Sequence, residues 1–380
     1  MQFRSFPTIP GLPISTLGFG CMRLPLKGRS PADIDEEAAT RLLHDAIDAG
    51  VNYVDTAWVY HAGQSEPLVA RALRGGYREK VQLATKHPVW LVQSEADWER
   101  YLDLQLKKLE TNRIDFYLLH ALDAERWETV RRHRGLQAME KALRDGRIGH
   151  LGFSFHGSQE AFRTIVAGYD WDFCQIQLNY LDTGYQAGLE GMRLAAERKI
   201  GVVVMEPLRG GALAKAPAAV ETIWAESGRS WSPAEWALRW VWNLPEVVTV
   251  LSGMNAPEQL RENLAVAEGS RPGTLTAAEL ELVDRARRIY QGKAKVPCTT
   301  CGYCLPCPHD VFISDALSLY NAALMFDSKE RPAATYQALF VSDGAGADQC
   351  IRCGECEPKC PQGIKIPDLL ADAHAYLMSP

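Results

Sequence analysis

The segment GVNYVDTAWVYHAGQSE, residues 50–66, places a strand, a loop and the start of a helix directly after one another. The short apolar run Val51–Val54 predicts a strand that ends in Asp55, and Tyr60 follows five residues later. In parallel α/β proteins the catalytic groups lie at the C-terminal ends of the strands. Asp55 and Tyr60 are therefore predicted to face one common site.

Two further polar residues close the next two predicted strands. Lys86 follows the β-rich run Val81–Thr85, and His120 closes the run Ile114–Leu119. Parallel strands bring their C-terminal ends to the same edge of a sheet, so both side chains are candidates for the same site.

Eight β-rich runs alternate with helical patterns along the first 290 residues. Apolar residues at helical spacing predict helices at Glu36–Ala49, Trp98–Leu109 and Leu136–Leu143. Eight strands that alternate with helices are typical of an α/β fold of the (β/α)8 TIM barrel class. The runs are Leu17–Cys21, Val51–Asp55, Val81–Lys86, Ile114–His120, Ile148–Ser154, Phe173–Leu178, Gly201–Met205 and Val247–Ser252.

The alternative fold is a doubly wound open sheet of the dinucleotide-binding type. That fold requires a glycine-rich turn that leads from the first strand into a helix. Here Gly18–Cys21 is followed by Met22–Pro25, which does not start a helix, so the barrel is favoured. Before the first strand, the proline-rich residues 1–15 are predicted to form a hairpin or an irregular cap.

The end of the predicted barrel leads into a second domain. Two more helices are expected at Pro257–Ala267 and Thr276–Tyr290, followed by a polar linker. We therefore expect a barrel domain over residues 1–290 and a small second domain over residues 291–380.

The composition limits the classes of partner. The net charge is −6, and no basic run suggests nucleic-acid binding. No apolar run is long enough for a membrane span. Because the first residues lack the features of a secretory signal, we expect the protein to be cytoplasmic.

Eight of the ten cysteines fall in two short blocks near the C-terminus. A disulfide framework would spread the cysteines and would suit an exported protein, so metal or cluster ligation is favoured. The second block has the bacterial ferredoxin spacing, and the first is one residue shorter before its fourth cysteine. Cys21 and Cys174 are expected to be buried apolar residues. The blocks contain Cys298, Cys301, Cys304 and Cys307, then Cys350, Cys353, Cys356 and Cys360.

The barrel segment resembles the aldo-keto reductase family, whose catalytic tetrad is Asp, Tyr, Lys and His in that order. The sequence segments Ala84–Lys86, Asp115–His120 and Gly149–Ser154 also resemble the family. The segment Gly18–Pro25 and the cysteine-rich tail resemble the subgroup that carries a C-terminal ferredoxin-like domain. The resemblance implies that the tetrad here is Asp55, Tyr60, Lys86 and His120.

These residue types support reversible carbonyl reduction. A phenol has a pKa of about 10, so Tyr60 donates a proton at neutral pH only if the remaining anion is stabilised. The Lys86 ammonium would stabilise that anion, and Asp55 would keep the lysine charged and oriented. His120 would donate a hydrogen bond to the substrate carbonyl, where negative charge grows during hydride attack. Tyr60 would then act as general acid in one direction and as general base in the other.

The resemblance also implies a bound NAD(P)H. Ser154 and Gln177, with Asn179 as a further candidate, would meet the nicotinamide carboxamide. Met205 would pack against the ring at the position where the family usually has a tyrosine, and Phe155 stands where an asparagine often follows the serine.

The adenosine end of the cofactor would contact the segment Gly253–Asn263. Gly253 and Gln259 occupy positions where a lysine and an arginine often bind a 2'-phosphate. Arg209 and Arg261 are candidates to compensate. These differences from the family affect the expected preference for NADP over NAD and do not affect the predicted fold.

Resemblance to two-cluster ferredoxins implies two [4Fe-4S] clusters. In those proteins, three cysteines of one block share a cluster with the last cysteine of the other. Structural zinc is the alternative, but zinc ribbons do not need the third closely spaced cysteine. The implied ligand sets are Cys298, Cys301, Cys304 and Cys360 for one cluster and Cys307, Cys350, Cys353 and Cys356 for the other.

Two functional hypotheses follow. The first is an NAD(P)-dependent oxidoreductase for a small-molecule carbonyl or alcohol, whose clusters exchange electrons with a redox partner protein or stabilise the tail. The second is an electron-transfer or redox-sensing protein in which the barrel is a docking or ligand-binding module. The ordered tetrad favours the first hypothesis, and the altered nicotinamide contacts favour the second. His61 and His156, next to Tyr60 and Ser154, are candidates for the substrate pocket, with a solvated position or a packing role as the alternatives.

Overall fold

The computed structural model describes residues 1–28, 30–298, 300 and 302–379. The chain divides into two compact units. The barrel unit comprises Met1–Ala214 and Trp231–Leu280, and the C-terminal unit comprises Lys215–Ser230 and Glu281–Pro380. The domain boundary after residue 290 stays a prediction.

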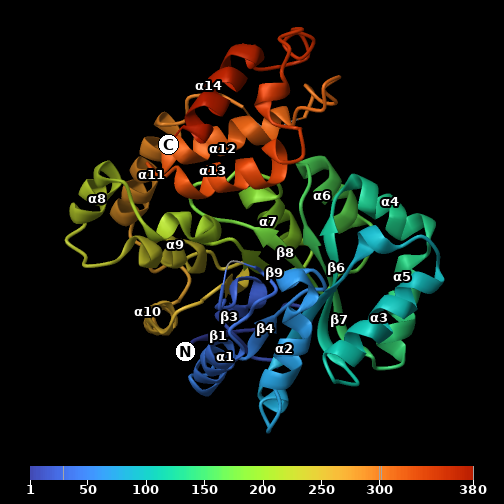
Figure 1. Cartoon of the computed structure of the whole chain (residues 1–380). Coiled ribbons are helices and arrows are strands. Elements are labelled where there is room, and N and C mark those ends of the chain that lie inside the picture. The colour runs from blue at the N-terminus through green and yellow to red at the C-terminus, as the bar shows by residue number, and fades with distance from the viewer. Residues whose placement is uncertain (29, 299, 301, 380) are drawn as a thin grey trace. The chain divides into compact units, whose positions relative to one another are not determined.

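Within the described residues, the barrel unit contains a closed barrel of eight parallel strands (Figure 1). Strand β10 closes the ring by pairing with β3 in parallel, with Val250 opposite Leu17. The predicted barrel is confirmed, and a doubly wound open sheet is excluded. The strands are β3 Leu17–Gly20, β4 Tyr53–Asp55, β5 Gln82–His87, β6 Ile114–Leu122, β7 Ile148–Phe155, β8 Phe173–Gln177, β9 Gly201–Met205 and β10 Val247–Ser252.

The predicted strand ends agree with these bounds to within two residues. The largest difference at a strand start is in β4, which begins at Tyr53 and not at Val51. Here the Asn52 amide N–H donates to the Ser15 hydroxyl at 3.0 Å, and the Ser15 amide N–H donates to the Asn52 side chain at 2.8 Å. These bonds fix Asn52 to the N-terminal segment, so the strand starts after it.

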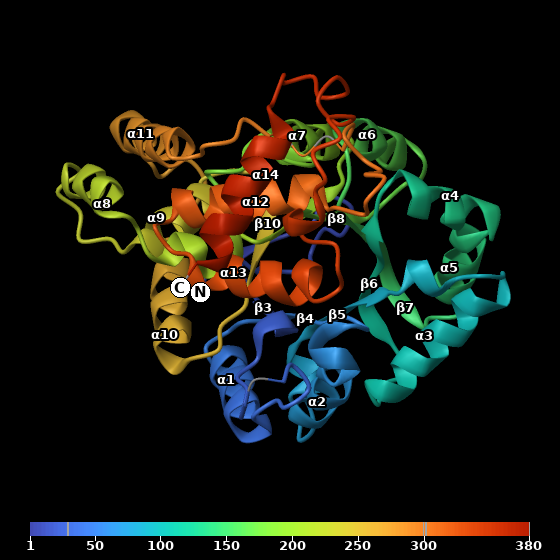
Figure 2. The same cartoon turned by 45° about the horizontal axis from the view of Figure 1, so that its top comes forward.

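Helices follow the strands and lie outside them, as α1, α2, α3 and α5 show in both views (Figure 1, Figure 2). Helix α1 begins at a cap in which the Asp35 carboxylate accepts a hydrogen bond from the Ala38 amide at 3.1 Å. No helix in the described part of the chain is long and apolar enough to cross a membrane. The helices of this unit are α1 Glu36–Asp48, α2 Ser65–Ala72, α3 Ala96–Lys108, α4 Ala124–Arg132, α5 Gly135–Arg144, α6 Gln159–Ala167, α7 Gly188–Glu197, α9 Pro233–Trp242 and α10 Pro257–Glu268.

The start of the chain closes the N-terminal end of the barrel. Strands β1 (Phe3–Arg4) and β2 (Ile14–Ser15) pair as an antiparallel hairpin, which confirms the hairpin alternative. The Phe6 ring packs between Phe116 and Phe173, at centroid distances of 5.1 and 5.7 Å. A side chain at Gly201 would place its Cβ 2.0 Å from the Phe6 ring, so a glycine is required there. The N-terminal end is thus filled by apolar side chains, and the C-terminal end is left for chemistry.

The C-terminal unit has a hydrophobic core of its own, built around α12 (Ile313–Met325) and α14 (Ile366–Met378). Helix α12 contacts α14 and also α13 (Glu330–Tyr336), which continues into a π-helical turn at Gln337–Val341. The chain between the two cysteine blocks is therefore largely helical. This unit also contains α8 (Ala218–Ala225) and much of α11 (Ala277–Gly292).

Candidate active site and cysteine pockets

The tetrad residues come from three neighbouring strands and one loop. Asp55 is the last residue of β4, Lys86 lies near the end of β5, and His120 lies near the end of β6. These strands pair in that order, with Asp55 opposite Ala84 and Lys86 opposite Leu118. Tyr60 begins a tight turn, Tyr60–Gly63, in the loop between β4 and α2. The barrel therefore brings the C-terminal strand ends together, as the sequence predicts.

The Lys86 ammonium is the centre of the site. It donates to the Asp55 carboxylate oxygens at 2.6 and 2.8 Å, to the Thr56 carbonyl at 2.8 Å and to the Tyr60 hydroxyl at 3.2 Å. The side chains of Lys86 and Asp55 are 1% and 2% exposed. A buried ammonium needs such a set of acceptors, since an unpaired charge in the interior is very costly.

Burial and neighbouring charges set the protonation states of Tyr60, Lys86 and Asp55. Burial raises the pKa of the Tyr60 phenol above 10.0, and the Lys86 charge opposes this shift. Burial opposes the charged form of Lys86, but attraction to Asp55 and Tyr60 outweighs it, so the pKa of Lys86 is raised above 10.5. Burial also raises the pKa of the Asp55 carboxyl, and Lys86 counteracts that change. At neutral pH the site thus contains an ammonium beside a protonated phenol.

His120 is the fourth residue of the tetrad. Its ring lies edge-on to Tyr60 at a centroid distance of 6.3 Å and packs against Trp90 at 5.1 Å. Burial, with a smaller effect of the Lys86 charge, lowers the pKa of His120 well below 6.5, so the ring is neutral. Among the described residues, its Nδ1 atom has no hydrogen-bond partner. A buried polar atom without a partner is a position where a ligand can bind.

Three predicted nicotinamide contacts lie at the C-terminal ends of β7 and β8, with Ser154 inside β7, Gln177 as the last residue of β8 and Asn179 two residues further on. The Ser154 hydroxyl oxygen accepts a hydrogen bond from the Ala121 amide at 2.7 Å, which leaves its own proton free to donate. The side-chain amides of Gln177 and Asn179 both donate to one Asp182 carboxylate oxygen at 3.2 Å. Asp182 was not predicted from the sequence, and only its position shortly after a strand could have indicated it.

Met205 and Phe155 differ from the residues that the family usually has at these positions, and their surroundings differ from one another. Met205 is the last residue of β9, and its sulfur accepts a hydrogen bond from the Gln175 side chain at 3.5 Å. Phe155 is fully buried, and its ring packs against Phe162 of α6 at a centroid distance of 4.9 Å. Phe155 is therefore a core residue and not a polar contact.

The predicted adenosine segment follows β10. A Cβ atom at Gly253 would lie 3.1 Å from the Arg23 side chain, so Arg23 covers this position. Gln259 accepts a hydrogen bond from the Asn255 amide at 2.9 Å, and the buried Asn263 donates to the Ser252 hydroxyl at 2.9 Å.

The arginines around this segment each have an acidic partner. Arg23 pairs with Glu206 at 3.2 Å, Arg209 with Asp182 at 3.2 Å, and Arg261 with Glu258 at 2.9 Å. Arg23 was not among the predicted contacts. Its place directly after the first barrel strand is the signal that could have indicated it.

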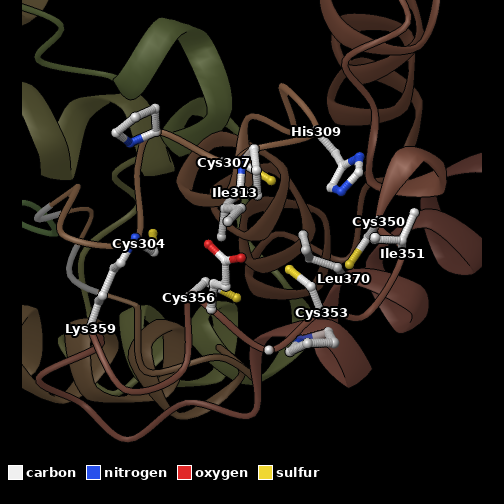
Figure 3. Close-up of a pocket in the computed structure, with 15 residues that line it drawn as sticks. Cys304, Cys307, His309, Ile313, Cys350, Ile351, Cys353, Cys356, Lys359 and Leu370 are labelled. Atoms are coloured by element: carbon white, nitrogen blue, oxygen red, sulfur yellow. The ribbon is translucent and has the colours of Figure 1, made fainter.

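The cysteines line two pockets of the C-terminal unit, and each pocket takes residues from both blocks. In Figure 3 the sulfur atoms of Cys307, Cys350, Cys353 and Cys356 surround a common space, and Cys304 lies beside them. The second pocket is lined by Cys298, Cys304 and Cys360. Cys301 lies outside the described residues.

The donor chemistry of the first pocket suits an iron-sulfur cluster. Burial raises the pKa of the Cys356 thiol to about 11, and the neighbouring Cys350, Cys304 and Cys353 add to this shift. Thiols crowded in this way need a positive centre to become thiolates together, and iron in a cluster is such a centre.

Comparison with known families identifies both parts of the chain. The sequence model of the aldo/keto reductase family matches residues 16–287. The model of the 4Fe-4S dicluster domain matches residues 297–364.

Similar proteins agree with the first match. A "Probable aldo-keto reductase 1" from Glycine max is 29% identical over 209 residues, which cover 53% of this chain and 58% of that protein. The "Uncharacterized oxidoreductase YrpG" of Bacillus subtilis strain 168 is 27% identical over 304 residues, covering 68% of this chain and 89% of YrpG.

Solved structures also agree. The aldo-keto reductase AKR11C1 from Bacillus halodurans, in its holo form, has a TM-score of 0.62 and 26% identity. The alignment covers 75% of this chain and 96% of that one. The thermostable aldo-keto reductase Tm1743, solved with the inhibitor epalrestat, also has a TM-score of 0.62, with 25% identity and coverage of 75% and 100%.

Proposed function

Because this chain belongs to the aldo/keto reductase family and carries a 4Fe-4S dicluster domain, we propose that it is an NAD(P)-dependent oxidoreductase of carbonyl or alcohol substrates. The observation that carries the proposal is the Lys86 ammonium, which lies 3.2 Å from the Tyr60 hydroxyl and is held by Asp55. This arrangement is a proton donor with a built-in stabiliser for the anion that it leaves behind.

In the reductive direction, a reduced nicotinamide cofactor, when bound, would supply the hydride that the carbonyl carbon accepts. Tyr60 donates its proton to the carbonyl oxygen, so that an alcohol forms and a tyrosinate remains. Lys86 stabilises this tyrosinate through the existing hydrogen bond. The neutral His120 donates a hydrogen bond to the same oxygen as charge develops on it. In the oxidative direction Tyr60 takes the proton back.

The nicotinamide cofactor is assigned to residues at and just after the C-terminal ends of β7 to β10. Ser154 has a free hydroxyl proton for the carboxamide oxygen, and the amides of Gln177 and Asn179 lie one strand further along. Met205 would pack on the ring in place of an aromatic residue. The adenosine end is assigned to Gly253, Gln259 and Asn263.

The two clusters are assigned to the two cysteine pockets. The pocket around Cys356 would bind one [4Fe-4S] cluster through Cys307, Cys350, Cys353 and Cys356. The other cluster would be bound by Cys298, Cys301, Cys304 and Cys360. Each cluster takes one electron at a time, whereas a hydride carries two, so the clusters suit exchange with a redox partner protein or stabilisation of their own unit.

The decisive experiment is Tyr60→Phe, which removes the proton donor and keeps the ring. We expect carbonyl reduction by NAD(P)H to fall by about a factor of 10³, while iron and sulfide per chain stay as in the wild type. Unchanged turnover would overturn the proposal and favour an electron-transfer or redox-sensing protein with a binding barrel. The buried Phe155, which cannot contact a carboxamide through a polar group, is the observation in favour of that second function.

A further inference from the structure

The chain makes a strained turn directly after Tyr60. His61 and Ala62 both have left-handed backbone conformations, with φ of 53° and ψ of 45° and 35°, and Gly63 follows with φ of 85°. Glycine adopts this conformation readily, but residues with a Cβ atom avoid it because of steric contact with the backbone. Two such residues in succession persist only where the surroundings hold them in place.

The His61 ring supplies such a constraint. Its Nδ1 lies 2.9 Å from the Pro31 carbonyl, and the Leu24 amide N–H donates to its Nε2 at 3.1 Å. Because Nε2 accepts a hydrogen bond from Leu24, Nδ1 is the ring nitrogen that donates to the Pro31 carbonyl. His61 is buried, and both ring nitrogens bind backbone groups of the segment between β3 and α1. The ring is therefore not available to a substrate.

The rest of the loop is anchored near its ends. The Thr56 and Ser65 hydroxyls bond to one another at 2.8 Å, and the Ser65 hydroxyl donates to the Cys21 carbonyl at 3.2 Å. Between these ends, the Tyr60 amide donates to the Ala57 carbonyl at 3.2 Å. The strained turn that follows Tyr60 is thus fixed through the His61 ring.

We propose that His61 is a positioning residue for carbonyl reduction. By holding the strained turn, it keeps the Tyr60 hydroxyl within reach of Lys86, whose ammonium is itself fixed by the Asp55 carboxylate and the Thr56 carbonyl. The proposal rests on the function of Tyr60 proposed above. A shift of about 1 Å at a reacting group costs up to about 100-fold in rate, so release of the turn has a direct effect on turnover.

The test is His61→Phe, which keeps an aromatic ring and removes both hydrogen bonds. We expect kcat to fall by about 10- to 100-fold with KM changed by less than about threefold, because binding of substrate and cofactor is retained. The matched control is His44→Phe on α1, where the ring also bonds a backbone carbonyl, Ala72 at 2.7 Å, but outside the tetrad loops. Its kcat is expected to stay within about twofold of the wild type.

A second substitution separates positioning from mere folding. In the double variant His61→Phe, Ala62→Gly, glycine lowers the cost of the left-handed turn, so part of the lost kcat is expected to return. If His61→Phe proves too unstable to study, His61→Gln replaces it, because a glutamine oxygen can still accept from the Leu24 amide. Its kcat is expected to fall by less than the about 10- to 100-fold loss expected for His61→Phe.

A spectroscopic readout keeps this inference distinct from the proposed function. With tyrosine labelled by ¹³C at Cζ, the signal that is absent in Tyr60→Phe reports Tyr60 whether or not the enzyme turns over. We expect this signal to move in His61→Phe and to return toward its wild-type position with Ala62→Gly. Wild-type protein without carbonyl reduction would overturn the proposed function alone. An unmoved Tyr60 signal in folded His61→Phe would overturn the role of His61.

Discussion

In the barrel unit, the Lys86 ammonium is surrounded by acceptors that the chain itself supplies, whereas in the C-terminal unit the cysteine sulfurs surround two pockets. The hydrogen bonds of the Lys86 ammonium are made before any ligand binds. The cysteine pockets need an inorganic cluster to balance their thiolates. The first kind of site is organised by folding, and the second contributes to folding when the metal binds.

The two sites also differ in how closely they adjoin the hydrophobic core of their own unit. The barrel packs Phe6 into its N-terminal end, away from the tetrad. In the C-terminal unit, Ile313 and Leu370 belong both to the first cysteine pocket and to the hydrophobic core. Loss of a cluster is therefore expected to loosen that core, while loss of a nicotinamide cofactor leaves the barrel core in place.

The largest effect is expected for Lys86→Met, which breaks the organised barrel site. It removes the stabiliser of the tyrosinate and leaves Asp55 buried without its partner. We expect kcat to fall by about 10³-fold and the free energy of unfolding to fall by about 3–5 kcal/mol, measured by steady-state kinetics and urea denaturation.

The control for Lys86→Met is Lys80→Met, because Lys80 is also paired with an aspartate but is exposed. Lys80 lies 2.8 Å from Asp48, and the two side chains are 50% and 53% exposed. An exposed ion pair contributes little to stability, so Lys80→Met is expected to change kcat and the free energy of unfolding only slightly. Equal losses in both variants would show that burial does not distinguish the barrel site.

A smaller effect is expected from His87, the residue after Lys86. Burial lowers the pKa of His87 from 6.5 to about 3, and its ring packs against Trp98 at 4.6 Å. Since the folded state resists protonation, the stability contributed by neutral His87 is present above pH 6.5 and is lost as the pH falls toward 3. Between pH 7 and pH 4 the wild type should lose about 3 kcal/mol more than His87→Phe, which cannot be protonated.

The measurement is urea denaturation of both proteins at several pH values, with the difference between them plotted against pH. Taking the difference removes the effect of the carboxylates that titrate in the same range. A difference that stays flat from pH 7 to pH 4 would contradict the expected cost of charging a buried imidazole.

The smallest effect is expected for Cys356→Ala, which removes one thiol from the first cysteine pocket. We expect iron to fall from about eight to about four atoms per chain, because one of two clusters loses a ligand. Amide hydrogen exchange should then speed up in α12 and α14 and stay unchanged in β5 and β6.

Cys174→Ala is the matched control for this loss of iron. Cys174 is a buried cysteine of β8 in the barrel unit, and its substitution is expected to leave the iron content unchanged. Full iron content in Cys356→Ala would remove Cys356 from the ligand set.

The elements whose signals are local in the sequence could be predicted. The eight strands follow from short apolar runs, and α1 follows from Leu42, Leu43, Ala46 and Ile47 at helical spacing; all four are buried. The cysteine blocks were recognisable from spacing alone, since cluster ligands lie close together in the chain. The order of Asp55, Tyr60, Lys86 and His120 was also visible, because each stands at or just after a strand end.

Only the tertiary structure decided which way particular side chains point. His61 was a candidate for the substrate pocket, yet its ring bonds to Leu24 and Pro31, residues 37 and 30 positions away in the chain. Phe155 occupies the position after Ser154, which we propose to bind the carboxamide, but packs on Phe162. Arg23 reaches Gly253 only because β10 closes the barrel beside β3.

The physical reason for this division is the range of each interaction. Strand and helix patterns and cysteine spacing depend on neighbours a few residues apart, so the sequence determined by itself that this chain has a barrel, an ordered tetrad and a cluster domain. The 2.6 Å ion pair of Lys86 and Asp55 and the turn at His61 depend on strand register and on contacts between distant segments. Those contacts form only when the barrel closes, and they set the proton chemistry of Tyr60.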